Sequence, residues 1–249
     1  MAATEKRGIQ SVDFIGNILS ALAASSNALP LKDLSSLTKV PAAKLHRYLT
    51  SLIRIGLASQ QADGKYDLGP LAIRIGLSAI GRRRIIDEAE TAARTVIEQH
   101  GVSGHLSVWS EHGPVIVRTV QGGVPLITSL GLGRTLPLSR SATGFVFLAH
   151  LPSRLTEPLL RQEARDQADL DAALKAAEQA RAEGIAVVDG TVIPGLAAIS
   201  VPIFDFDSNL ACALTLTAMT GGFGPKPLAS APAGALRDIA RAISLRHLP

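Results

Sequence analysis

The chain has 249 residues, of which 47% are hydrophobic and 18% are charged. This length fits two modest domains or one large one, and the composition excludes a chain that is disordered throughout. The single cysteine, Cys212, excludes an internal disulfide framework and suits a reducing cytoplasm. The N-terminus lacks the apolar core of a signal peptide, and no stretch approaches the ~20 apolar residues of a membrane span. We therefore expect a cytoplasmic protein without membrane contact.

Positive charge is concentrated in the first third of the chain. Residues 1–84 carry 12 Lys and Arg against 5 Asp and Glu, whereas residues 85–249 carry 13 against 16. This asymmetry is expected when one end of a protein meets a polyphosphate. Small domains also carry such a charge by chance, so the charge alone does not decide the partner.

Apolar residues at helical spacing predict three helices, over residues 11–24, 31–38 and 42–55. The residues expected to face the core include Val12, Leu37 and Ile53. Between the second and third helices lies the turn 39–41, whose proline suits the first position of a helix. Gly56 is expected to end the third helix.

Two short strands, 57–59 and 65–68, are predicted next, with Gly64 free to take a positive φ in the turn between them. Three helices followed by a β-hairpin predict a winged helix-turn-helix domain over residues 1–69. The helical pattern of residues 70–86, which ends in three arginines, is interpreted as a linker helix. These arginines either contact the DNA backbone or form a solvated helix end.

Residues 87–249 predict a second domain of mixed type. Helices are expected over 87–100, 141–150, 153–183 and 227–245. Strands are expected over 105–110, 114–121, 125–130, 185–188, 196–204 and 210–217. Because the strands are mostly antiparallel and the helices are grouped at the edges, the predicted fold class is α+β.

The outward face of the predicted third helix carries the residues that would meet DNA. A major groove admits one helix, and the N-terminal turns of that helix reach deepest. Lys44 and Arg47 are long donors for guanine edges or phosphates, whereas the hydroxyls and the arginine farther along suit phosphates. The candidate DNA-binding residues are Ala43, Lys44, His46, Arg47, Thr50, Ser51, Arg54 and Lys65. The alternative is a three-helix module that binds a protein instead.

Several segments resemble the IclR family of bacterial regulators. SVDFIGNILSAL and LPLKDLSSLTKVPAAKLHRYLTSLIRIGLASQQADGKYDLGP are similar to its N-terminal half. LGLGRTLPLSRSATGFVFLAHL and ARAEGIAVVDGTVIPGLAAISVPIFDFDSNLACALTLT are similar to a loop-and-helix segment and to closing strands of its second domain. The resemblance covers nearly the whole chain and implies a GAF-like effector-binding domain over 87–249 that also makes homodimer or homotetramer contacts. The chain departs from the family at Lys39, where glycine is usual, at Ala43-Lys44, and at Asp189-Gly190.

The resemblance also implies a small-molecule site in the second domain. The candidate effector-binding residues are Ser141, Ala142, Thr143, Gly144, Asp189, Leu196, Ala198, Thr215 and Thr217. Free backbone N–H groups at the start of a helix near Ser141 would suit an anion, and two threonines share one face of a strand. We therefore hypothesise a small organic or aromatic acid in a largely apolar pocket. Ordinary interpretations are a helix cap at Ser141, strand threonines, and a plain turn at Asp189.

Motifs of common enzymes are missing from the sequence. It contains neither a Gly-x-Ser-x-Gly elbow nor a phosphate loop ending in Gly-Lys-Ser/Thr. His100, His105 and His112 are predicted on different elements, so no metal, cofactor or catalytic residue is expected. The sequence predicts a DNA-binding transcriptional regulator that responds to a small molecule. The alternative is a GAF-like binding protein or enzyme with a non-functional DNA-binding domain.

Overall fold

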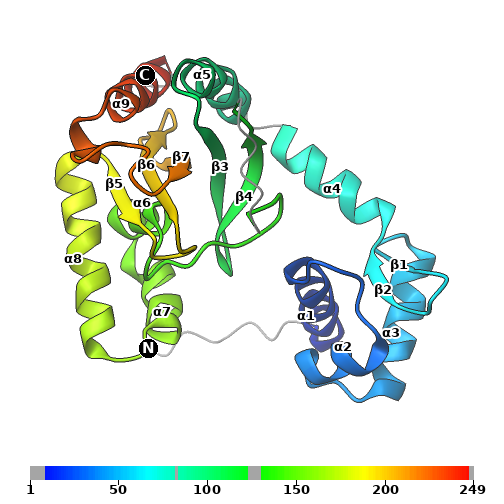
Figure 1. The fold of residues 1–249 in the computed structure, drawn as a ribbon. Coiled ribbons are helices and arrows are strands. Elements are labelled where there is room, and N and C mark those ends of the chain that lie inside the picture. Colours follow the sequence, from blue (N-terminus) through cyan, green and yellow to red (C-terminus); the bar gives the residue numbers. More distant parts are fainter. Residues whose placement is uncertain (1–8, 82–83, 123–129, 247–249) are drawn as a thin grey trace. The chain divides into compact units, whose positions relative to one another are not determined.

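The computed structural model describes residues 9–81, 84–122 and 130–246, which form two units that divide between residues 82 and 83. Figure 1 shows the elements of each unit. In the first unit, the described helices before the hairpin are α1 (Gln10–Ala24), α2 (Leu31–Thr38) and α3 (Ala42–Arg54). They pack around a buried core that includes Ile18, Leu34 and Leu49. Gly56, at φ 81°, follows α3 as predicted.

A β-hairpin follows the helices. β1 (Ala58–Gln60) pairs antiparallel with β2 (Tyr66–Leu68), and Gly64 takes φ 83° in the turn. Leu29 adds an isolated bridge to Tyr66. α4 (Pro70–Gly81) completes the unit. The predicted order of helices and hairpin, which is that of a winged helix-turn-helix, is confirmed.

Three residues that were predicted to face this core are exposed instead. Val12 is 58% exposed, Leu37 is 62% exposed and Ile53 is 36% exposed. Short helices cover only one side of each other, so apolar residues at the rim of each stripe stay in solvent. Each buried stripe is therefore narrower than the sequence pattern suggests.

The second unit is built on a sheet of five strands among the described residues, in the order β4-β3-β7-β6-β5, with antiparallel neighbours throughout. The strands are β3 (Ser103–Ser110), β4 (Gly113–Val120), β5 (Ala186–Asp189), β6 (Leu196–Phe204) and β7 (Leu210–Met219). α5 (Arg84–His100) and α9 (Ala231–Arg246) pack together against the sheet. α6 (Ala142–His150) also packs on it, α8 (Gln167–Glu183) packs on α6, and α7 (Ser153–Glu163) lies beside them. The α+β prediction is confirmed, but the helices lie over the sheet rather than at its edges, because its apolar residues need cover.

Element boundaries differ from the prediction in places. The linker helix was predicted to run to residue 86, but α4 ends at Gly81 and α5 begins at Arg84, because Ile85 and Ile86 are buried in the second unit. The predicted helix 153–183 is two helices, since the Asp166 side chain accepts a hydrogen bond from the amide of Asp169 and starts α8. The last helix starts at residue 231, after a 3₁₀ turn over 227–229. Residues 82–83 and most of the predicted strand 125–130 lie outside the described residues.

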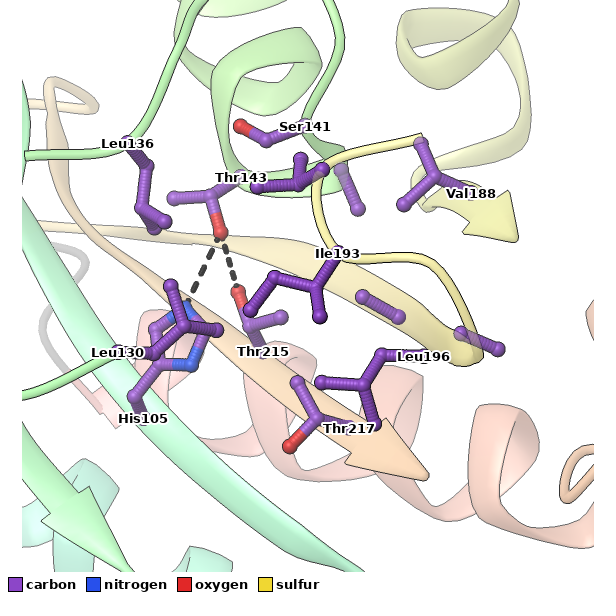
Figure 2. A pocket seen from close by; sticks show the side chains of 14 residues that line it. His105, Leu130, Leu136, Ser141, Thr143, Val188, Ile193, Leu196, Thr215 and Thr217 are labelled. Carbon is purple, nitrogen blue, oxygen red and sulfur yellow. Dashed lines mark hydrogen bonds between the residues drawn. The ribbon is translucent and has the colours of Figure 1, made fainter. Parts of the chain in front are cut away.

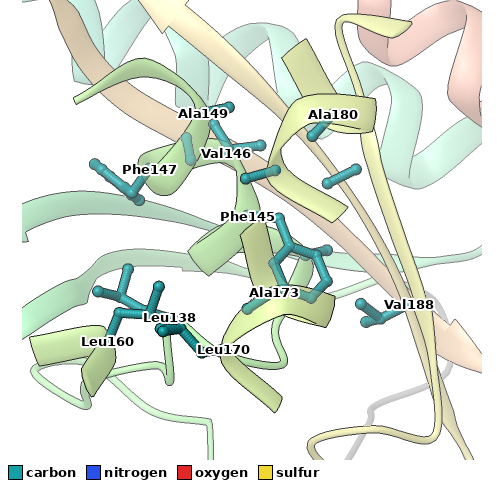
Figure 3. Close-up of a cluster of buried hydrophobic side chains, with 14 residues drawn as sticks. Leu138, Phe145, Val146, Phe147, Ala149, Leu160, Leu170, Ala173, Ala180 and Val188 are labelled. Carbon is teal, nitrogen blue, oxygen red and sulfur yellow. The ribbon is translucent and has the colours of Figure 1, made fainter. Parts of the chain in front are cut away.

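A cluster of buried apolar side chains fixes α6 between α8 and the sheet (Figure 3). It includes Phe145 and Phe147 of α6, and Leu170 and Ala173 of α8. Gly144 allows the close approach of α6 to the chain before it, since an added Cβ would lie 2.4 Å from the carbonyl oxygen of Pro137. The N-terminus of α6 is therefore held in a fixed position above the sheet.

Candidate DNA-binding surface and effector cavity

The turn before α3 is set by an unusual backbone. Lys39 lies in the left-handed region, at φ 54° and ψ 26°. Val40 is 2% exposed, and its carbonyl accepts a hydrogen bond of 2.7 Å from the hydroxyl of Ser35. Lys39 therefore takes a conformation that glycine adopts without strain, and a residue with a side chain adopts it at a steric cost.

The outward face of α3 carries the candidate DNA-binding residues. The exposed ones are Ala43, His46, Arg47, Thr50, Ser51 and Arg54. Within residues 9–81, neither Arg47 nor Arg54 forms an ion pair with a carboxylate. Two guanidinium groups are thus presented without a competing partner on the face that would enter a groove.

Lys44 is directed differently from its neighbours. Its ammonium lies 3.6 Å from the ring centroid of Phe14 in α1 and 6.0 Å from that of Tyr48. The two rings lie 5.9 Å apart. Lys44 is half-buried and joins α3 to α1 by a cation–π contact, which makes it less free to read a base than Arg47.

Other candidates of this surface are engaged locally. The Thr50 hydroxyl donates to the carbonyl of His46 at 2.9 Å, and the Ser51 hydroxyl donates to that of Arg47 at 3.2 Å. Each hydroxyl must leave its carbonyl before it can donate to a phosphate. At the wing, Lys65 Nζ lies 2.7 Å from Asp63 Oδ2, and hydrogen bonding to Lys65 lowers the pKa of that carboxyl. Of the long basic side chains proposed to contact DNA in the first turns of α3, Arg47 is therefore the one without an ion pair or ring contact within residues 9–81.

A small cavity lies between the N-terminus of α6, the sheet and the 190–195 loop (Figure 2). Seven of the nine residues proposed from the sequence line it: Ser141, Ala142, Thr143, Leu196, Ala198, Thr215 and Thr217. The lining residues that sequence reasoning missed are His105, Leu130, Leu136, Val188, Val192, Ile193 and Ala197. The cavity volume is about 30 Å³, which is room for water rather than for an organic molecule.

Four buried polar side chains form a hydrogen-bonded chain at the base of this cavity. Thr215 Oγ1 donates to Ser200 Oγ at 2.9 Å. Because the Thr215 proton is used there, Thr143 Oγ1 donates to Thr215 Oγ1 at 2.8 Å. The oxygen of Thr143 then accepts from Nε2 of His105 at 3.3 Å, which assigns the proton of the neutral imidazole to Nε2. Figure 2 shows the two contacts of Thr143.

Burial lowers the pKa of His105 to about 4, and the side chain is 5% exposed. The imidazole is therefore uncharged at neutral pH. The strand register explains its place, since His105 of β3 lies opposite Thr215 of β7. That pairing joins strands more than a hundred residues apart, so the sequence offered no local signal for it.

The hydroxyls of Ser141 and Thr217, which both line the cavity, differ in their hydrogen bonding. Ser141 caps α6: its oxygen accepts from the amide of Gly144 at 2.8 Å and its proton goes to the carbonyl of Pro137 at 2.6 Å. Thr217 is 8% exposed, and its hydroxyl has no hydrogen-bond partner among the described residues. Among the described residues, the Thr217 hydroxyl is therefore free of internal hydrogen bonds, whereas the hydroxyl proton of Ser141 is donated to Pro137.

Two of the predicted effector residues lie outside the cavity lining. Asp189 is exposed, and its carboxylate accepts a hydrogen bond of 2.6 Å from the hydroxyl of Thr220. Gly144 is part of the packing of α6 described above. Among the described residues, no cluster of histidine, cysteine or acidic side chains has the arrangement of a metal site. The helices described include none with the length and apolarity needed to cross a bilayer.

Comparison with known proteins identifies the family of both units. Residues 11–62 match the IclR helix-turn-helix domain, and residues 77–245 match the C-terminal domain of the bacterial transcriptional regulator IclR. The chain belongs to the IclR family of bacterial transcriptional regulators. It is a regulator rather than an enzyme, and DNA binding is the property its helix-turn-helix supplies.

Individual relatives support the family. The chain is 26% identical over 229 residues to the HTH-type transcriptional regulator XynR of Escherichia coli, covering 89% of this chain and 91% of that protein. It is 31% identical to HmgR of Pseudomonas aeruginosa, with a TM-score of 0.59 and coverage of 96% and 98% of the two chains. A regulator structure from Silicibacter sp. TM1040 shares the fold, with a TM-score of 0.81 at 20% identity over 95% and 98% of the chains.

Proposed function

We propose that this protein is a sequence-specific regulator whose α3 enters the major groove of operator DNA and whose second unit binds a small organic or aromatic acid. The observation that carries the DNA part is the exposed face of α3, on which Arg47 and Arg54 make no ion pair within the described residues. Arg47 contacts a base edge or a phosphate, and Arg54 a phosphate.

The DNA part is tested by the affinity of the full-length protein for duplex DNA from upstream of its own gene, measured over a range of salt concentrations. Arg47→Ala should weaken binding by about 1–3 kcal/mol if it reads a base. Arg154→Ala is the matched control, because Arg154 is an exposed arginine of the second unit. Wild-type binding that does not weaken with salt would contradict the proposal, since phosphate contacts release counterions.

The effector part is supported by the composition of the cavity. Its walls are mostly aliphatic, which suits an apolar body, and Thr217 offers an uncommitted hydroxyl. The first amides of α6, those of Ala142 and Thr143, have no carbonyl within the helix to donate to, and they can meet a carboxylate. An acid of modest size fits this chemistry if the cavity widens, and Val192 and Ile193 are lining residues that belong to no helix or strand.

The effector class is tested by calorimetric titration of the full-length protein with benzoate, phenylacetate and pyruvate. We expect one or more of the acids to bind, and Thr217→Val to weaken the binding about tenfold through loss of one hydrogen bond to a charged group. Thr119→Val, at an exposed position of β4, is the control. If none of the three acids binds, the proposed effector class is wrong.

We further propose that the protein acts in the cytoplasm as a homodimer or homotetramer. α4 exposes Ile73, Ile75 and Leu77, which are 58%, 54% and 63% exposed. Ile73 and Leu77 are four residues apart and share one face of α4, and such an apolar face is typical of a contact with another chain. Paired half-sites also require paired recognition helices. Sedimentation of Ile73→Asp with Leu77→Asp should show smaller particles than the wild type, whereas Leu155→Asp in α7 should not. An unchanged mass would exclude α4 as the contact.

A further inference from the structure

An acid in this cavity would meet no positive charge. Within the described part of the chain, the lining contains no lysine or arginine, and His105 is its one titratable side chain. A carboxylate placed among aliphatic walls loses its hydration, and hydroxyls and amides return only part of that energy. A charge that enters such a site needs a compensating charge nearby.

We propose that His105 supplies this charge: an acidic effector binds as its anion together with one proton, which the imidazole of His105 takes up. The inference rests on the proposed effector class and adds a dependence on pH to it. The proton comes from solvent and forms a new N–H bond at Nδ1, because Nε2 already carries the proton that is donated to Thr143. The ligand stays a carboxylate, the histidine becomes an imidazolium, and the cavity stays neutral.

The carboxylate of a bound acid would lie close enough to the His105 imidazole to raise its pKa. His105 Nε2 lies 3.3 Å from Thr143 Oγ1, and Thr143 lines the cavity at the N-terminus of α6. An anion that contacts this end of the cavity lies within about 4–6 Å of the imidazole, the range in which an opposite charge raises a histidine pKa. In the free protein burial alone holds the pKa of His105 near 4, so the proton is taken up when the anion arrives.

No neighbouring strand offers a competing charge in the described structure. On β7, Thr215 lies opposite His105, and the titratable Cys212 points to the other face of the sheet by strand alternation. On β4, Arg118 also points to the other face, where it donates hydrogen bonds to Glu90 and Asp87. The β6 sequence carries no titratable side chain.

α6 and the segment that precedes it also place no charged side chain in the described cavity lining. α6 carries Thr143 beside His105, while its own titratable group, His150, lies at the opposite end of the helix. In the segment that leads to α6, Arg134 and Arg140 are the charged side chains, and neither belongs to the cavity lining. His105 is therefore the group that responds when a carboxylate enters.

The test is calorimetric titration of the full-length protein with benzoate, phenylacetate and pyruvate in buffers of different ionisation enthalpy at pH 6. Close to one proton should be taken up per bound anion, and affinity should rise by about tenfold as the pH is lowered from 6.5 to 5.5. His105→Gln should abolish the uptake and flatten the pH dependence. His112→Gln, in the exposed turn between β3 and β4, should change neither.

The outcomes separate this inference from the proposed function. Binding without proton uptake by the wild type overturns the role of His105 and leaves the acid effector in place. Uptake that persists in His105→Gln also overturns it. Failure of all three acids to bind overturns the effector class itself. If the variant does not fold, the buffer series on the wild type can still overturn the inference, because binding without proton uptake excludes it.

Discussion

Lys39 shows how the backbone conformation of one residue sets the turn between α2 and α3. Its φ of 54° is costly for a residue with a side chain, by about 1–2 kcal/mol, and the turn into α3 is built on it. The sequence comparison with the family identified the position, because glycine is usual there. The resemblance does not predict which backbone conformation a lysine adopts there. The structure shows that Lys39 adopts the left-handed conformation.

Lys39→Gly should therefore stabilise the first unit by roughly 0.5–1 kcal/mol, because glycine adopts positive φ without strain. Lys32→Gly is the matched control: Lys32 is exposed within α2, where glycine should cost about 0.7–1 kcal/mol. Hydrogen exchange of the α2 and α3 amides in the full-length protein measures the stability change caused by each substitution. Slower opening for Lys32→Gly than for Lys39→Gly would contradict the assignment of strain to residue 39.

His105 makes the stability of the second unit depend on pH. Its folded pKa of about 4 lies below the ordinary 6.5, so between these values the unfolded chain binds a proton that the folded chain does not. Stability therefore falls as pH is lowered, by about 2 kcal/mol from this group between pH 8 and pH 5. Trp109, the single tryptophan, packs against Phe147 at 5.7 Å between ring centroids and reports unfolding of this unit.

The measurement is urea unfolding at several pH values, followed by Trp109 fluorescence. His105→Gln should show a shallower loss of stability below pH 6.5 than the wild type, and His112→Gln should follow the wild type. Identical profiles for wild type and His105→Gln would mean that the histidine is not held neutral by burial.

At the scale of elements, Gly144 allows α6 to approach the chain segment that precedes it. Gly144→Ala would place a Cβ 2.4 Å from Pro137 O and 2.7 Å from Leu138 Cα, so it should cost about 1–3 kcal/mol or more. Gly234→Ala is the matched control within α9, because its Cβ would meet nothing within 4 Å. That change should stabilise by about 0.5–1 kcal/mol. Equal effects of the two substitutions on urea unfolding would contradict the packing described for α6.

The elements also show what the sequence can predict. Leu45, Leu49 and Leu52 recur at helical spacing, so the buried side of α3 follows from local pattern alone. The end of α4 at Gly81 does not follow from local pattern. Ile85 and Ile86 continue the helical pattern, but they are buried in the second unit as part of α5. Lys44 illustrates the same limit, since its contact with Phe14 depends on how α1 crosses α3.

At the scale of the whole molecule, the sequence indicated the two sites but not the full cavity. Thr143, Thr215 and Thr217 were found from family resemblance and strand alternation. The sequence does not predict a place for His105 in the cavity, because its position beside Thr143 depends on the pairing of β3 with β7. Long-range register is set by the completed sheet, and no local pattern encodes it.

Regulation requires that the acid have different affinities for two arrangements of the protein that differ in DNA binding. By reciprocity, the operator affinity must then change when the acid is bound, typically by about 5–150-fold. The cavity lies in the second unit and α3 in the first, so a change in operator affinity reports coupling between them. An acid that binds both arrangements equally would leave the operator untouched.

The most direct measurement is the dissociation constant of the full-length protein for its upstream DNA, with and without a saturating acid that calorimetry has shown to bind. The account predicts salt-sensitive binding that shifts at least fivefold with the acid, and in Thr217→Val the same shift should need about tenfold more acid. An operator affinity that is unchanged while the acid is bound would contradict it.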